Sequence, residues 1–114
     1  MKEYLFLFRG GQEELVMQSP EQAQVHMQKW VQWMRDLQEK GCLLNAQPLD
    51  HSGRKIIGSK KIVTDGAYIE GKEMVGGYLM CKADHYDSAI EMAMSCPLLD
   101  FDSGIVEIRE IKEM

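Results

Sequence analysis

The sequence lacks a long apolar run. Its longest one, residues 4–8, is far shorter than the ~20 residues that a bilayer-spanning helix needs, and no apolar leader segment follows the first residue. Aromatic side chains make up only 8% of the 114 residues. A chain of this length usually forms one domain with one core. We therefore expect a single cytoplasmic domain over residues 1–114, with no membrane partner.

Basic residues are in the minority, and cysteines are few. The chain has 13 Lys and Arg residues against 18 Asp and Glu residues, for a formal net charge of −5. A nucleic-acid partner is not expected, because phosphate-backbone binding normally needs a positive stripe. The three cysteines are odd in number and far apart in the sequence, so a disulfide framework is not expected either.

The motifs of common metal and cofactor sites are missing. His26, His51 and His85 do not form a His-x3-His pair, and the cysteines do not form Cys-x2-Cys. The chain has no G-x-G-x-x-G, P-loop or G-x-S-x-G sequence. We therefore predict no bound metal and no cofactor.

The pattern of apolar residues predicts an α+β fold. Residues 3–8 form a first strand, and Ser19 followed by Pro20 begins a helix that extends to about residue 40. The apolar stripe of that helix is expected to contain Ala23, Met27, Trp30, Met34 and Leu37.

The second half of the chain predicts more strands and a second helix. Residues 42–49 and 55–63 are expected to pair as a hairpin, and residues 64–72 to form a loop. A strand over residues 74–83, a helix over 86–95 capped by Asp84, and a strand over 104–112 complete the order. This order is typical of the split βαβ sheet of ferredoxin-like folds.

Both faces of the predicted sheet carry apolar side chains. The first strand presents Leu5 and Leu7 on one face and Tyr4, Phe6 and Phe8 on the other. Two helices cover only one face of such a sheet. Because an exposed aromatic and aliphatic patch is unusual in a monomer, we predict that a second copy of the chain covers the other face and forms a dimeric α/β barrel.

Two segments are candidates for a functional site. His26 lies beside Trp30 and Trp33 on the first helix, and its imidazole can act as a general base or as a packed histidine with one ordinary hydrogen bond. Residues 65–73 place three carboxylates and one ammonium between two strands. That segment can form the rim of a polar pocket, or it can be a solvated loop.

The order of several short motifs resembles the YCII-related family, and within it the DGPF-domain branch. The matching residues, which extend over nearly the whole chain, are His26 to Trp30, Trp33-Met34, Thr64-Asp65-Gly66, Lys72-Glu73, Gly76-Gly77-Tyr78, Ala89, Cys96-Pro97 and Val106 to Arg109. The Pro-Phe of the branch motif is Ala67-Tyr68 here, which adds a hydroxyl to the aromatic ring.

The resemblance implies a dimeric ferredoxin-like barrel and cofactor-independent chemistry. Enzymes of this family act on small ring compounds, for instance removing chloride from a chlorinated hydroxyquinol, and a His–Asp pair is their proposed active site. Other DGPF members are associated with alternative sigma factors. The alternatives are therefore a lyase or isomerase, a ligand-sensing module with a regulatory protein partner, and a dimer without a retained site.

For an enzyme, we expect His26 to transfer a proton, and Asp65 to orient the imidazole or stabilise the imidazolium. A small aromatic or oxygenated substrate would contact Trp30, Trp33, Tyr68, Tyr78 and Arg109. Arg109 can instead form an ordinary cross-strand pair with Glu107.

Overall fold

The computed structural model describes residues 1–66 and 74–114. The elements in chain order are β1 (Lys2–Arg9), α1 (Gln12–Val16), α2 (Pro20–Glu39), β2 (Leu43–Pro48), β3 (Arg54–Ile57), β4 (Ile62–Asp65), β5 (Val75–Ala83), α3 (Tyr86–Met94), the 3-10 helix η2 (Pro97–Asp100) and β6 (Ile105–Glu110).

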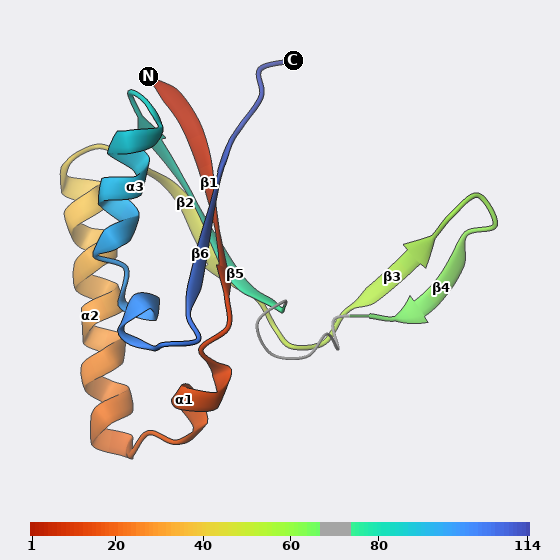
Figure 1. The fold of residues 1–114 in the computed structure, drawn as a ribbon, viewed down its shortest axis with the longest axis horizontal. Coiled ribbons are helices and arrows are strands. Elements are labelled where there is room, and N and C mark those ends of the chain that lie inside the picture. Colours follow the sequence, from red (N-terminus) through yellow and green to blue (C-terminus); the bar gives the residue numbers. More distant parts are fainter. Residues whose placement is uncertain (67–73) are drawn as a thin grey trace.

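Four of the strands form an antiparallel sheet in the order β2-β5-β1-β6. The two longest strands, β1 and β5, lie at its centre, and α2 and α3 pack on one face (Figure 1). This strand order with two helices on one face is that of a ferredoxin-like fold, so the α+β prediction is confirmed. The second barrel half that the sequence predicts would come from another chain.

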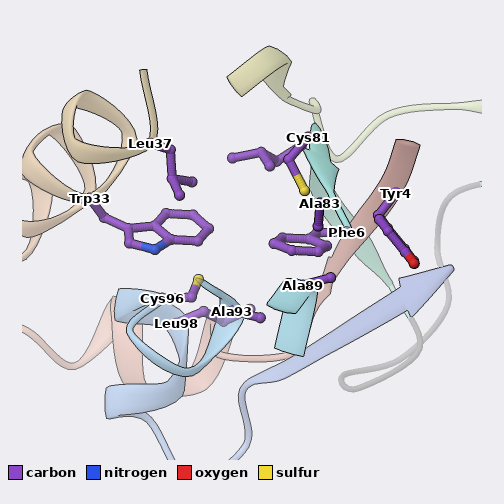
Figure 2. Close-up of a cluster of buried hydrophobic side chains, with 11 residues drawn as sticks. Tyr4, Phe6, Trp33, Leu37, Cys81, Ala83, Ala89, Ala93, Cys96 and Leu98 are labelled. Carbon is purple, nitrogen blue, oxygen red and sulfur yellow. The ribbon is translucent and has the colours of Figure 1, made fainter. Parts of the chain in front are cut away.

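The core lies between the helices and that face of the sheet (Figure 2). Tyr4, Phe6, Leu79 and Cys81 are fully buried because alternate residues of β1 and β5 point toward the helices. Trp33 of α2 lies opposite them. The predicted core position of Cys81 is confirmed.

The first long helix begins and ends close to its predicted limits. The Ser19 side chain accepts a hydrogen bond from the Gln22 backbone N–H, and the Gln22 side chain accepts one from the Ser19 backbone N–H. This capping box satisfies two backbone donors that have no partner inside the helix. The helix extends from Pro20 to Glu39.

The buried stripe of α2 differs from the predicted one. Ala23 and Met27 are exposed, and the buried residues of this helix are His26, Trp33 and Leu37. The reason is that the ring N–H groups of His26 and Trp33 donate to the backbone carbonyl oxygens of Pro97 and Met92, respectively. Turning these rings inward rotates the helix and leaves Met27, about 100° away from His26, in solvent.

Three further predictions are corrected. Strand β2 pairs with β5 and not with the segment that follows it, and residues 55–63 are not one strand. Gly58 (φ 69°) and Lys61 (φ 54°) make a tight turn in the left-handed region, so that β3 and β4 form their own hairpin. The N-cap of α3 is His85, whose Nδ1 accepts from the Ser88 N–H, and not Asp84.

The short helix α1 is also absent from the predictions. It follows Gly10 and Gly11, both with positive φ. A Cβ at Gly10 would lie 2.0 Å from the Ser103 carbonyl oxygen, so only glycine allows the chain to pass here. Among the described residues, no helix is long and apolar enough to cross a membrane.

Candidate functional site

His26 is buried on the inner side of α2, with only 7% of its surface exposed. Its Nε2 lies 3.1 Å from the carbonyl oxygen of Pro97, which begins η2. Because a carbonyl oxygen only accepts, Nε2 carries the proton and donates it. In the neutral ring, Nδ1 therefore keeps the lone pair and is the nitrogen that can bind a proton.

Aromatic rings surround this imidazole. The Phe101 ring lies 4.6 Å from it between centroids and is tilted by 33°, while the Trp30 ring is 6.4 Å away and nearly perpendicular. Trp30 in turn contacts Phe8 of β1 and Trp33, both edge to face. These contacts fix the orientation of the imidazole and give it an apolar surrounding.

An open hollow of about 550 Å³ lies beside this cluster. It is lined by Glu13, Glu14, Met17, Gln18, Gln22 and Phe101. Phe101 is shared by the hollow and the His26 contact, and Gln22 precedes His26 by one turn of α2. The hollow and the His26 cluster therefore share the Phe101 ring, although His26 is not among the residues that line the hollow.

Two polar side chains that line the hollow, Glu14 and Gln18, differ in their hydrogen bonding. Glu14 accepts hydrogen bonds from the Ser103 N–H (3.2 Å) and the Ser103 hydroxyl (2.6 Å), and these bonds lower the pKa of its carboxyl group. Oε1 of Gln18 is buried and has no hydrogen-bond partner among the described residues. The hollow thus presents negative charge, while Oε1 of Gln18 is buried away from solvent.

The structure does not bring Asp65 to His26 within one chain. Asp65 ends β4 of the projecting hairpin, where its carboxylate pairs with Arg54 of β3. His26 makes its hydrogen bond to Pro97 instead. The role of Asp65 at the imidazole stays a prediction.

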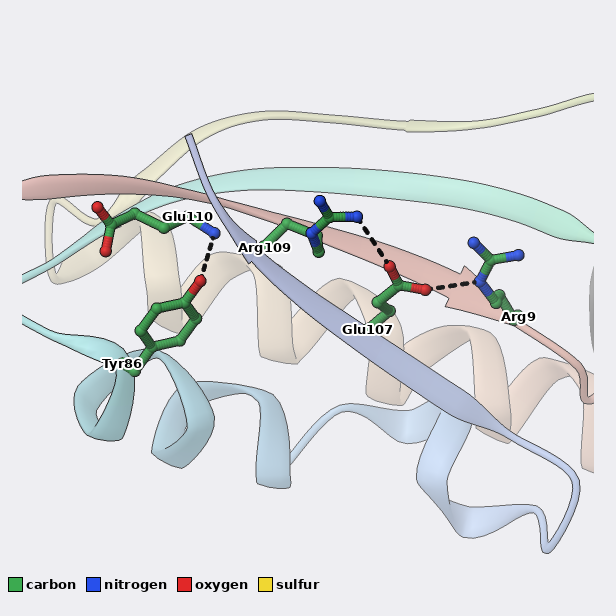
Figure 3. A network of polar contacts seen from close by, with 5 residues as sticks. All are labelled: Arg9, Tyr86, Glu107, Arg109 and Glu110. Atoms are coloured by element: carbon green, nitrogen blue, oxygen red, sulfur yellow. Dashed lines mark hydrogen bonds and ion pairs between the residues drawn. The ribbon is translucent and has the colours of Figure 1, made fainter. Parts of the chain in front are cut away.

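Two other predicted residues lie on the face of the sheet opposite the helices. Tyr78 of β5 accepts a 3.3 Å hydrogen bond from the Asn45 amide on β2. Arg109 donates to Glu107 of its own strand at 3.4 Å, and Glu107 also accepts from Arg9 of β1 at 3.1 Å (Figure 3). Arg109 therefore takes part in a surface ion-pair network.

Two predicted site residues remain, Trp33 and Tyr68. The Trp33 indole donates to the carbonyl oxygen of Met92 at 3.1 Å, which ties α2 to α3. Trp33 also borders a second hollow of about 490 Å³ between these helices, together with Lys40, Lys82 and Asp84. Tyr68 lies outside the described residues.

No motif or periodic pattern in the sequence marks Phe101, Gln22, Glu14 or Pro97 as residues of this site. Pro97 lies 71 residues after His26, and no periodic pattern joins two segments that far apart. Pro97 entered the sequence analysis only through the Cys96-Pro97 motif of the family resemblance. Among the described residues, no group of three or more His, Cys, Asp or Glu side chains is arranged to hold a metal ion.

The fold and site are those of a ferredoxin-like α+β domain with a buried histidine on its first long helix. Comparison with family models matches residues 3–114 to the YCII-related domain. The chain therefore belongs to the YCII-related family. No curated protein matches it significantly.

Proposed function

We propose that this YCII-related chain belongs to the DGPF branch and binds a small organic molecule beside His26, where the imidazole transfers a proton. The observation that carries the proposal is the hydrogen bond from Nε2 of His26 to the Pro97 carbonyl oxygen. It fixes the tautomer and reserves Nδ1 for accepting and releasing a proton. This arrangement needs no metal and no cofactor.

The walls of the hollow limit the ligand class. Phe101 offers an apolar face, while Glu13 and Glu14 repel anions. The Glu13 carboxylate can also accept a hydrogen bond, which favours a ligand that donates one. A compact, uncharged ring compound with hydroxyl groups fits these three requirements, and proton transfer to or from its ring carbons is lyase or isomerase chemistry.

Solvent deuterium incorporation tests this function. Hydroxylated aromatic compounds would be screened by ligand-observed NMR in D2O, first for binding and then for exchange of ring protons. We expect His26→Gln to abolish catalysed exchange and to weaken binding about tenfold, because Gln donates to Pro97 but is not a base. Met27→Gln, at the exposed neighbouring position, is the matched control.

Two outcomes would contradict the proposal. Exchange that is equally fast in His26→Gln would remove the proton-transfer role. If the unaltered protein binds the compound but does not catalyse exchange, the chain is a ligand-sensing module and not an enzyme. Urea unfolding of both variants checks that neither result comes from loss of the fold.

We also propose that the functional unit is a cytoplasmic homodimer formed through the helix-free face of the sheet. This face consists of the side chains on β1, β5 and β6 that point away from the helices, with Leu5, Leu7, Tyr78 and Met80 at its centre. These four residues are only half-buried in a single chain. Burial of such a patch is favourable at roughly 25 cal/mol per Å² of apolar area. Three unpaired cysteines agree with a reducing compartment.

A further inference from the structure

The hairpin of β3 and β4 (residues 54–65), here called the arm, stands away from the rest of the chain (Figure 1). It forms a two-stranded sheet of its own, with no ladder to the four-stranded sheet. The chain is correspondingly extended, with a radius of gyration of 15.6 Å. A compact domain of this length has about 13 Å.

The arm is apolar on both of its faces. Ile56 pairs with Val63 and Ile57 with Ile62, and successive residues of a strand point to opposite faces. The exposed fractions of these four side chains are 70%, 60%, 52% and 53%, in that order. An isolated two-stranded hairpin is at best marginally stable in water, so an arm of this composition indicates a surface that is covered in the functional protein.

The charge of the arm is opposite to that of the remaining chain. The arm contains four basic residues, Arg54, Lys55, Lys60 and Lys61, and one acidic residue, Asp65. The rest of the chain contains 9 basic and 17 acidic residues. The rest of a second copy therefore carries a net charge opposite to that of the arm, which favours association of the two.

The arm also lies on the side where a second copy would be. It projects away from α2 and α3, on the side of the sheet that these helices leave open (Figure 1). A molecule seated on the helix-free face would have the arm directly beside it. We propose that the arm is a clasp that packs its aliphatic side chains against the body of a second copy, reciprocally in a twofold dimer. This inference rests on the proposed homodimer.

Sedimentation equilibrium of the full-length chain tests the clasp. One variant, Ile57→Ser with Ile62→Ser, removes an apolar pair, and another, Lys55→Glu with Lys60→Glu, reverses charge and keeps the aliphatic residues. We expect each to raise the dimer dissociation constant about tenfold or more. Val25→Ser with Met27→Ser is the matched control, because both side chains are exposed and aliphatic and lie on α2, away from the arm.

The salt dependence of the dimer dissociation constant separates the electrostatic contribution of the arm from its apolar contribution. Added salt should weaken the unaltered dimer and have a smaller effect on the charge-reversed variant, since exposed charges are screened. Circular dichroism and urea unfolding verify that the body remains folded, which we expect because the arm contributes no residue to the core.

The outcomes distinguish the clasp from the homodimer itself. If the unaltered chain dimerises and both arm variants dimerise equally well, the clasp is wrong and the homodimer stands. A monomeric unaltered chain would overturn both. Binding of DNA or anionic vesicles that is lost in the charge-reversed variant, with an unchanged dimer, would also overturn the clasp and assign the arm to a polyanion.

Discussion

At the scale of single residues, polar atoms decide which side of a helix faces inward. Apolar periodicity placed Met27 in the buried stripe and left His26 out of it, yet the histidine is buried and the methionine is 63% exposed. A hydrogen-bonded imidazole can be buried at low cost, and a methionine tolerates solvent. The acceptor that makes this possible, the Pro97 carbonyl oxygen, cannot be found from the spacing of residues on α2.

The three thiols should differ in reactivity for the same physical reason. Burial raises the pKa of Cys81 to about 11 and that of Cys96 to about 12, whereas Cys42 is half-buried at the start of β2. Only a thiolate is nucleophilic, so the two buried thiols stay protonated and inert at pH 8. We expect one thiol per chain to react rapidly with an aromatic disulfide reagent and all three to react in denaturant. Rapid reaction of all three in the folded protein would refute this.

At the scale of elements, the terminal signals of α2 were reliable, whereas the predicted cap of α3 and the predicted strand pairing were wrong. Ser19 and Pro20 predicted the start of α2 at the correct residue, because a capping box is a local interaction. The pairing of β2 with β5 depends on the sheet order and is not local. The arm resulted from one turn, Gly58 to Lys61, inside a segment whose composition suits a single strand.

The capping box allows a quantitative test. Replacing Ser19 with Ala leaves the Gln22 backbone N–H without its acceptor and should lower the free energy of unfolding by about 1 kcal/mol. Ser59→Ala, in the exposed turn of the arm, is the control and should change it by less than about 0.5 kcal/mol. Urea titration of both variants measures the difference. Equal stabilities would mean that the cap does not stabilise α2.

At the scale of the whole molecule, the sequence predicted a sheet with two apolar faces, and the four-stranded sheet has this arrangement, while β3 and β4 form a second sheet. The helices cover Tyr4 and Phe6, and they leave Leu5 and Leu7 on the open face. The predicted site residues, by contrast, divide among the helix layer, the open face and the arm. A sequence pattern identifies residues able to do chemistry, but only the fold shows which of them meet.

The proposed homodimer requires that a second copy covers the open face. Isotope-filtered NMR on a mixture of carbon-13-labelled and unlabelled protein measures this contact directly, through the methyl groups of Leu5, Leu7 and Met80. We predict nuclear Overhauser effects from these methyl groups to protons of the unlabelled copy, and none from the buried Leu79 on the helix side. Absence of any such intermolecular effect at Leu5, Leu7 and Met80, at concentrations where the chain is fully associated, would contradict the claim.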